Sequence, residues 1–197
     1  GDAHCANCHG GAEFTKATVH HIKNERLENM IMGDGGKAFY DSGFYNIGVR
    51  PTREDLGVGG KDPFGFPLSE SRLARDFGDK TFKKLIGVDP NEKPKSKDRV
   101  AANGAFKTPG LRNVELTAPY FHNGGQRTLR QVVDFYNRGG DFHDQNIDDL
   151  DPDVERLGLS DADKDALVAF LKSLTDERVR SRCAPFDHPE LYIPNGH

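Results

Sequence analysis

Two segments in the second half of the chain carry apolar residues at the spacing of an amphipathic helix. After Thr128, apolar residues recur at i, i+3, i+4 and i+7, which predicts a helix that ends at Gly139-Gly140. Ser160 is followed three residues later by Asp163, the pattern of a capped helix start. The helix that begins there is expected to be amphipathic as well. Its apolar face is formed by Leu167, Phe170, Leu171 and Leu174.

The first half of the chain shows no sustained period. Residues 33–66 carry glycine or proline every few positions, which predicts long loops. Residues 69–75 and 81–85 favour two short helices, and the polar segment 88–100 predicts an exposed connector. Three prolines in residues 182–197 predict an extended strap on the surface. No alternating run is long enough to predict a β-sheet, so the expected fold class is mainly α with long irregular loops.

Composition indicates one domain with a small apolar core. The 197 residues are expected to form a single domain, and 35% hydrophobic residues with 22 Gly and 11 Pro leave little material for a core of side chains alone. A buried cofactor would supply some of the missing apolar mass. The net charge of −4, without a basic stripe, argues against a nucleic-acid partner. No apolar run approaches the ~20 residues of a membrane span.

Near the start of the chain stands a C-x-x-C-H motif, made of Cys5, Cys8 and His9. Its two thiols can form thioethers with the two vinyl groups of one porphyrin, and the histidine is then held beneath the iron as a ligand. The alternatives are a redox pair or half of a zinc site. A Cys₄ zinc site would need a second C-x-x-C, whereas the remaining cysteine, Cys183, stands alone. The motif therefore predicts one covalently attached haem c.

Attachment of haem c takes place outside the cytoplasm, so a periplasmic or otherwise extracytoplasmic location is expected. An export signal must then once have preceded Gly1. The short distance from Gly1 to Cys5 fits a mature chain after cleavage or a fragment of something longer.

Five sequence blocks together resemble one family. They are residues 5–9, 44–52 (FYNIGVRPT), 106–114 (FKTPGLRNV), 116–124 (LTAPYFHNG) and 184–189 (APFDHP). The chain resembles the C-terminal haem domain of the bacterial dihaem cytochrome c peroxidase family, including its MauG branch. The resemblance implies a cytochrome c-like fold over 1–197 and a peroxidase-type oxidoreductase. It also implies an N-terminal haem domain, which this chain lacks, or a separate haem chain as partner, and a redox partner protein.

The resemblance assigns a sixth iron ligand to Tyr136. In the peroxidase branch a methionine stands fourteen residues after the histidine that matches His122, and in MauG a tyrosine ligand takes that place; here the position is Tyr136. The alternative is that Tyr136 only packs in the core, since it completes the apolar stripe of its helix. Met30 and Met32 are the remaining alternatives, and their position favours core packing.

Further residues receive roles from the same resemblance. His122 is expected to form hydrogen bonds near the haem, with a distal ligand or catalytic base as the alternative in a monohaem protein. The backbone carbonyls of Thr117 and Pro119 would hold Ca²⁺ together with a ligand from the N-terminal domain. Arg112 and Lys107 could pair with haem propionates or be ordinary surface charges.

One position departs from MauG. MauG passes oxidising equivalents through a tryptophan two residues before the first haem cysteine, whereas this chain has Ala3 there and no tryptophan at all. That route cannot operate here. Tyr40, Tyr45 and Tyr120 are the candidates to replace it.

Other polar residues carry no metal-site spacing. Cys183 is expected to be free or bonded to another chain. The histidines outside the motifs are expected to be solvated or structural: His4, His20, His21, His143, His188 and His197. An acidic stretch without EF-hand spacing predicts a solvated loop: Asp144, Asp148, Asp149, Asp151 and Asp153.

The favoured function is that of a six-coordinate haem domain, with His9 and Tyr136 as axial ligands, which stores or relays oxidising equivalents from H₂O₂. The first alternative is a monohaem electron carrier without peroxidase activity. The second is a five-coordinate haem, free of Tyr136, that binds small ligands or peroxide on its own.

Overall fold

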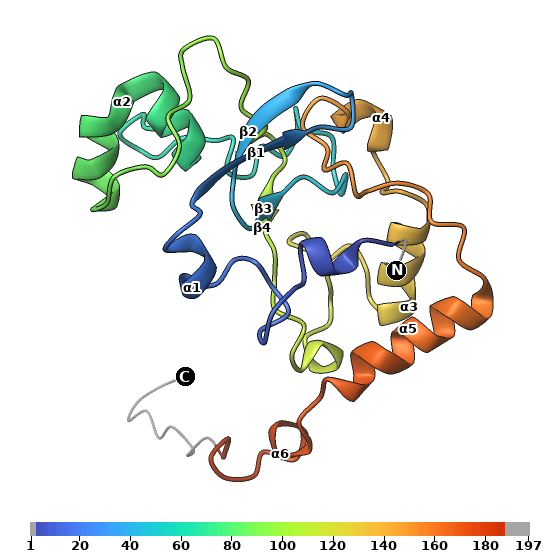
Figure 1. The fold of residues 1–197 in the computed structure, drawn as a ribbon. Coiled ribbons are helices and arrows are strands. Elements are labelled where there is room, and N and C mark those ends of the chain that lie inside the picture. Colours follow the sequence, from blue (N-terminus) through green and yellow to red (C-terminus); the bar gives the residue numbers. More distant parts are fainter. Residues whose placement is uncertain (1–2, 188–197) are drawn as a thin grey trace, which may run out of the picture.

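Short helices and two two-stranded sheets make up the described part of the chain, residues 3–187 of this computed structural model (Figure 1). Helix α2 and the β1–β2 hairpin lie at one end and helices α3 and α5 at the other, with β3 and β4 between them. In chain order the elements are η1 (Cys5–Asn7), α1 (Val19–Ile22), β1 (Leu27–Ile31), β2 (Lys37–Asp41), β3 (Phe44–Tyr45), α2 (Glu70–Ile86), β4 (Phe106–Lys107), η2 (Val114–Leu116), α3 (Leu129–Asn137), α4 (His143–Asn146), α5 (Asp161–Ser173) and α6 (Glu177–Arg180).

The two helices predicted from periodicity and caps are confirmed as α3 and α5. Thr128 accepts a hydrogen bond from the backbone N–H of Gln131, whose side chain accepts one from the Thr128 N–H in return. Ser160 and Asp163 form the same reciprocal pair at the start of α5. Helices α3 and α5 contact each other, but the apolar face of α5 is only partly covered, and Phe170 remains 47% exposed.

The two short helices predicted at 69–75 and 81–85 are both present, as the two halves of α2 on either side of a kink at Gly78. The φ of Gly78 is 74°, a left-handed conformation that glycine adopts readily. Ser69 caps the start of the helix by accepting from Arg72 N–H. Buried side chains of α2 pack on β1 in the first hydrophobic cluster, made of Leu27, Leu73, Ala74 and Phe82.

The prediction that the chain forms no β-sheet was wrong, because β1 and β2 pair antiparallel over five residues each. Strand β2 and strand β3 both lie inside the segment 33–66, for which loops were predicted. The strands are short, and β1 alternates weakly, with a buried residue at its start and half-buried ones after it. Cross-strand packing therefore decides this region more than local pattern does. Met32, Ala38 and Ala101 form the second cluster there, and Met30 packs against it.

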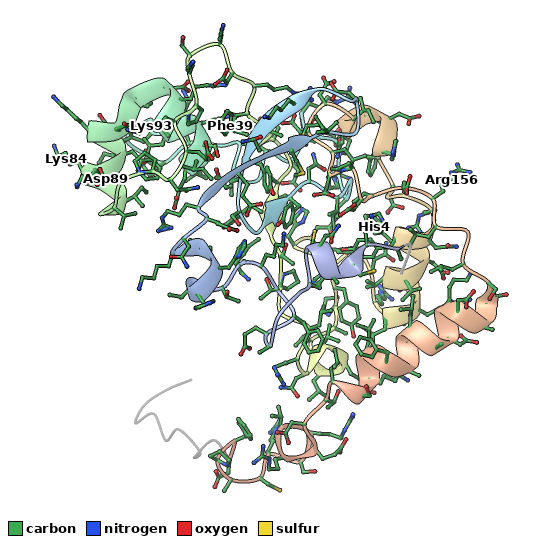
Figure 2. The ribbon with its side chains drawn as sticks, in the orientation of Figure 1. His4, Phe39, Lys84, Asp89, Lys93 and Arg156 are labelled. Carbon is green, nitrogen blue, oxygen red and sulfur yellow. The ribbon has the colours of Figure 1, made fainter. Side chains whose placement is uncertain are left out.

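The connector at 88–100 is largely exposed, as predicted. Two ion pairs connect it to α2: Lys93 with Asp79 at 2.6 Å and Lys83 with Asp89 at 2.7 Å. Figure 2 labels Lys93 and Asp89. The strap predicted over 182–197 falls mostly outside the described residues. Among the described helices, none has the length and apolar character to cross a membrane.

Thr128→Ala is expected to lower the free energy of unfolding by about 1 kcal/mol, because the start of α3 loses its capping hydroxyl. Urea unfolding measures the change. Thr128→Ser keeps the hydroxyl and serves as the matched control, which should stay close to the wild type. Equal stability of the alanine and serine variants would contradict the cap.

Candidate functional site

The C-x-x-C-H motif lies on η1 and the turn that follows it. The backbone N–H of His9 donates to the carbonyl of Cys5 at 2.8 Å, which closes this turn. Cys5 is exposed, Cys8 is half-buried, and both thiols are free. Lys16 N–H donates to the carbonyl of Cys8 at 2.9 Å and fixes the second cysteine against the next loop. Both thiols are thus available for two thioether bonds to one group.

The imidazole ring of His9 is held in place by a hydrogen bond to the backbone. Its Nδ1 lies 3.0 Å from the carbonyl oxygen of Phe14. Burial lowers the pKa of His9, and hydrogen bonding to the carbonyls of Phe14 and Pro109 opposes this only in part. A carbonyl can only accept, so Nδ1 carries the proton and Nε2 keeps its lone pair. Histidines that bind metals commonly have this arrangement, since the hydrogen bond fixes both tautomer and ring orientation.

Tyr136, in the last turn of α3, lies near the same motif. Burial raises the pKa of its phenol, and the charges of Cys8 and Cys5 add to the rise. The rings of Phe135 and Phe121 stand edge-on to Tyr136, with centroids at 5.3 and 6.3 Å. The phenol is therefore held in an apolar setting close to both thiols. Whether it binds iron stays a prediction.

The acidic stretch is a solvated loop only in part: Asp144 and Asp148 are exposed as predicted, whereas Asp149, Asp151 and Asp153 are not. Asp153 accepts from His4 Nδ1 at 2.9 Å and from Asn7 Nδ2 at 2.8 Å, so it holds the attachment motif itself (Figure 2 labels His4). Asp151 is 4% exposed and accepts from the N–H of Asp153. Asp149 accepts from Asn103. In the sequence, the spacing of these acids did not indicate a metal site. Their hydrogen-bond partners lie on distant segments, so no local sequence pattern could have predicted these contacts.

Tyr45 carries a buried hydroxyl that lacks a hydrogen-bond partner within residues 3–187. It is 6% exposed, and burial raises its pKa, followed by the charge of Cys8. An unpartnered buried hydroxyl costs about 1–3 kcal/mol, which a bound group with an acceptor would recover. Free thiols, a histidine with a free Nε2 and this hydroxyl together fit a covalently attached haem with acidic side groups.

His122 is paired with a residue that the sequence analysis missed. Its ring stacks on Phe106 with centroids 3.6 Å apart, and its Nε2 lies 2.5 Å from Asp55 Oδ2. Phe106 lies opposite Tyr45 in the β3–β4 pair. The stacked Phe106 ring thus connects His122 to the β3–β4 pair that carries Tyr45. Among the described residues, no contact is observed between His122 and the C-x-x-C-H motif.

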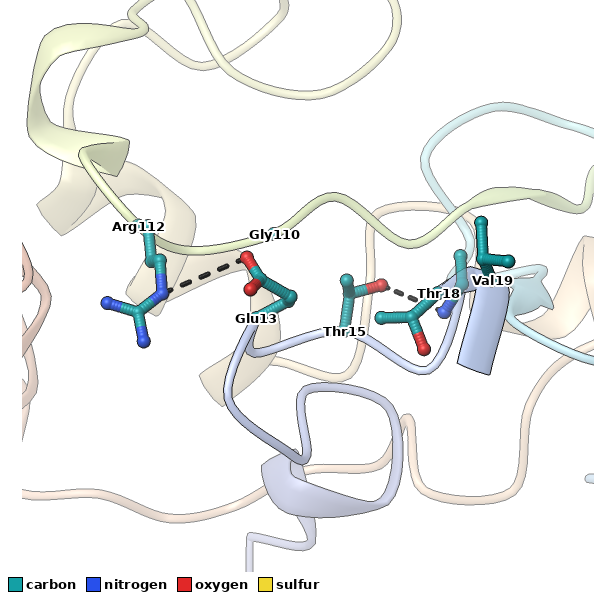
Figure 3. A pocket seen from close by; sticks show the side chains of 7 residues that line it. Glu13, Thr15, Thr18, Val19, Gly110 and Arg112 are labelled. Carbon is teal, nitrogen blue, oxygen red and sulfur yellow. Dashed lines mark hydrogen bonds and ion pairs between the residues drawn. The ribbon is translucent and has the colours of Figure 1, made fainter. Parts of the chain in front are cut away.

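Arg112 braces the loop that follows the motif. Its Nε donates to the carbonyl of Ala12 at 2.8 Å and lies 3.8 Å from Glu13, while its guanidinium stands 5.8 Å from the Phe14 ring centre (Figure 3). Lys107 donates to the carbonyl of Thr108. The two cations thus bind backbone carbonyls near His9, and propionate binding stays a prediction for them.

The remaining predicted residues lie apart from the motif. Thr117 and Pro119 occupy an exposed loop after η2, where their carbonyls as calcium ligands stay a prediction. Met32 is 2% exposed within the second hydrophobic cluster, as expected of a core methionine. One group was missed: His21, Glu25 and Glu28 place one potential ligand atom each within 4.8 Å of one another. His21 lies on α1, Glu28 on β1 and Glu25 between them, so no single-helix spacing could have indicated the group.

Comparisons with known proteins agree with the resemblance. No family model matches the chain. It is 51% identical over 82 residues to the cytochrome-c peroxidase IdrP2 of Denitromonas iodatirespirans, and 39% identical over 95 residues to the methylamine utilization protein MauG of Paracoccus denitrificans. These segments cover 42% and 40% of this chain, but only 20% and 24% of the two relatives.

A solved structure matches over more of the chain. The crystal structure of a MauG-like protein associated with microbial copper homeostasis aligns with a TM-score of 0.53 and 25% identity. The alignment covers 94% of this chain and 46% of that one. The chain thus corresponds to about half of that structure and, in sequence, to about a fifth of the curated relatives it matches.

Asp153→Ala is expected to lower the free energy of unfolding by about 1–2 kcal/mol, because His4 and Asn7 lose their shared acceptor. Urea unfolding of the purified protein checks this. Asp144→Ala is the matched control, since Asp144 is fully exposed and pairs with its neighbour His143. An equal loss of free energy of unfolding in the two variants would contradict the stabilising role of Asp153.

Asp151→Asn is expected to change the pH dependence of stability. Burial raises the pKa of Asp151 from 3.8 to about 6, so the folded state retains a proton that the unfolded state has lost between these values. Ionisation of Asp151 therefore lowers the free energy of unfolding by at most roughly 3 kcal/mol. The full loss is present above about pH 6, and there is no loss below about pH 4. The variant should gain stability relative to wild type as pH rises from about 4 to about 7 in urea titrations. Parallel pH profiles would contradict this.

Proposed function

We propose that this chain, which is homologous over part of its length to bacterial cytochrome c peroxidases and MauG proteins, is a c-type haem domain of a peroxidase-type oxidoreductase. The hydrogen bond that leaves His9 Nε2 free beside two free thiols is the observation that carries the proposal. The Cys5 and Cys8 thiols would attach the porphyrin, and His9 Nε2 would bind its iron. Bound haem would supply one-electron redox chemistry.

Tyr136 is the proposed second axial ligand. Tyr136 is half-buried, and the partial burial of its phenol near Cys5 and Cys8 disfavours the phenolate as long as no cation is nearby. A ferric iron beside the oxygen would reverse this preference, because a metal cation is the largest local charge in such a site. An oxygen donor of phenolate character favours the more oxidised states of the iron. The chain would therefore store oxidising equivalents better than it would donate electrons at high potential.

Two occupied axial positions leave this domain no place to activate peroxide. The proposed enzyme therefore needs a second haem, on an N-terminal domain or a separate chain, that reacts with H₂O₂. A redox partner protein would receive the oxidising equivalents, and the carbonyls of Thr117 and Pro119 would contribute to a calcium site between the haems. The proposed location is the periplasm or another extracytoplasmic space.

A monohaem electron carrier is the second candidate, because the sequence contains a single C-x-x-C-H motif. The ratio of haem to protein in material purified from its native source separates the two candidates. One haem per chain and no second haem chain in the preparation would favour the carrier. Two haems per complex would favour the enzyme.

Tyr136→Phe in the haem-loaded protein is expected to convert the iron from six-coordinate to five-coordinate and to raise its reduction potential, because the oxygen ligand is lost. Absorption and electron paramagnetic resonance spectra with redox titration measure both effects. Tyr120→Phe removes another phenol on a loop and should leave the spectra unchanged. Spectra of Tyr136→Phe identical to those of wild type would exclude Tyr136 as a ligand.

A further inference from the structure

Glu28 and Tyr40 form a polar cross-strand pair inside the β1–β2 hairpin. Their Cα atoms are direct partners in the antiparallel register, so both side chains stand on the same face. The Tyr40 hydroxyl donates to Glu28 Oε2. Ser42 Oγ donates to the other carboxylate oxygen at 2.5 Å, and His21 Nε2 lies 3.2 Å from that oxygen. A buried phenol is thus hydrogen-bonded to a carboxylate that an imidazole also contacts.

The group runs from the interior to the surface. Tyr40 is 6% exposed, whereas the side chains of Glu28 and His21 are 21% and 24% exposed. Glu25, on the other side of the His21 ring, is 62% exposed. A proton released at Tyr40 therefore has a hydrogen-bonded path outward.

Hydrogen bonds keep Glu28 in the deprotonated form that a proton acceptor needs. Burial acts to raise the pKa of Glu28, but hydrogen bonds from Ser42, Tyr40 and His21 outweigh it and leave the pKa lowered. Burial, followed by the hydrogen bond to Glu28, raises the pKa of Tyr40. At neutral pH the pair is therefore a phenol facing a carboxylate, as transfer of a proton on oxidation requires.

Tyr45 connects this pair to the attachment motif. The rings of Tyr40 and Tyr45 lie 5.6 Å apart between centroids. Tyr45 pairs with Phe106 across β3 and β4, and the chain after β4 reaches Pro109, whose carbonyl faces His9. Thr15 Oγ1, which donates to the Thr108 carbonyl at 2.8 Å, ties the same stretch to the loop after the motif.

We propose that Tyr40 is a redox-active tyrosine, with Glu28 as its proton acceptor and His21 as the link to solvent. This rests on the proposed haem function. One electron would leave the Tyr40 phenol through the Tyr45 ring for the group held by Cys5, Cys8 and His9, after hydrogen peroxide had oxidised that group by way of the partner haem. The Tyr40 O–H bond breaks and its proton moves to Glu28 Oε2, which leaves a neutral tyrosyl radical and a carboxylic acid. One electron from the redox partner protein and the proton held by Glu28 would restore the phenol.

Tyr40 is preferred over the other candidate tyrosines because of its acceptor. The Tyr45 hydroxyl has no hydrogen-bond partner among the described residues, so a proton lost there has no protein acceptor within reach. Tyr120 is partly exposed, and its pKa is raised by burial and then by the charge of Glu115, without a hydrogen bond to a carboxylate in the described structure. Tyr45 can pass an electron, whereas Tyr40 can also give up its proton.

The test oxidises the haem-loaded protein in two ways and detects tyrosyl radicals by electron paramagnetic resonance. A flash-generated ruthenium(III) complex supplies a one-electron oxidant that does not depend on the haem, and hydrogen peroxide, added with the partner haem protein, supplies the haem-dependent one. Both should give a tyrosyl signal in wild type. Tyr40→Phe should lose most of it, while Tyr120→Phe should keep it.

Glu28→Gln separates the acceptor from the phenol. Glutamine accepts a hydrogen bond but takes up no proton, so the signal of Glu28→Gln should also be largely lost, and Glu28→Asp should restore part of it. Ser42→Ala removes a different hydrogen bond to Glu28 and should retain the signal, and circular dichroism checks that each variant is folded. A full signal in Tyr40→Phe or in Glu28→Gln would overturn the proposal. A Tyr40-dependent signal with ruthenium but not with peroxide would support the redox-active pair and overturn the haem function proposed above.

Discussion

The hydrogen bond between His9 Nδ1 and the Phe14 carbonyl is the constraint on which the candidate site depends. It exists because the loop turns back at Phe14, whose φ of 51° is left-handed and unfavourable for a phenylalanine. Such a conformation persists only where its surroundings enforce it. Arg112 does so from one side, with its hydrogen bond to Ala12 and its position over the Phe14 ring, and Thr15 does so from the other through Thr108. A strained residue is thereby used to fix a histidine tautomer.

Hydrophobic clusters and hydrogen bonds stabilise different parts of the fold. Both hydrophobic clusters involve the β1–β2 hairpin or its immediate surroundings, and one of them includes α2. Around the attachment motif, hydrogen bonds that Asp153 accepts and that Arg112 donates join segments that are distant in sequence. Helix α5 buries its apolar face only partly. This distribution supports the expectation that an attached macrocycle supplies apolar surface on that side of the molecule.

The sequence predicted those features whose signals are local. Capping residues and the 3.6-residue period predicted α3 and α5 because both are properties of adjacent turns. The C-x-x-C-H motif is an equally local signal, and the haem attachment that it predicts at Cys5, Cys8 and His9 stays a prediction. The hairpin was missed because its strands are short and are stabilised by cross-strand pairing. Asp153 and Asp55 were missed because their partners lie 146 and 67 residues away, at distances that no spacing pattern encodes.

Charge links the attachment motif to the Tyr40–Glu28 pair. Lys16 acts to lower the pKa of Cys8, Glu28 and Asp151 alike, so its charge acts on all three groups. Arg112 and Lys107 add two further cations near His9. Under the proposed function, an oxidised centre at this site would draw an electron most readily from a donor that can also release its proton. Tyr40 meets that condition because Glu28 stands opposite it across the hairpin, so the register of β1 on β2 fixes which tyrosine can respond to the haem site.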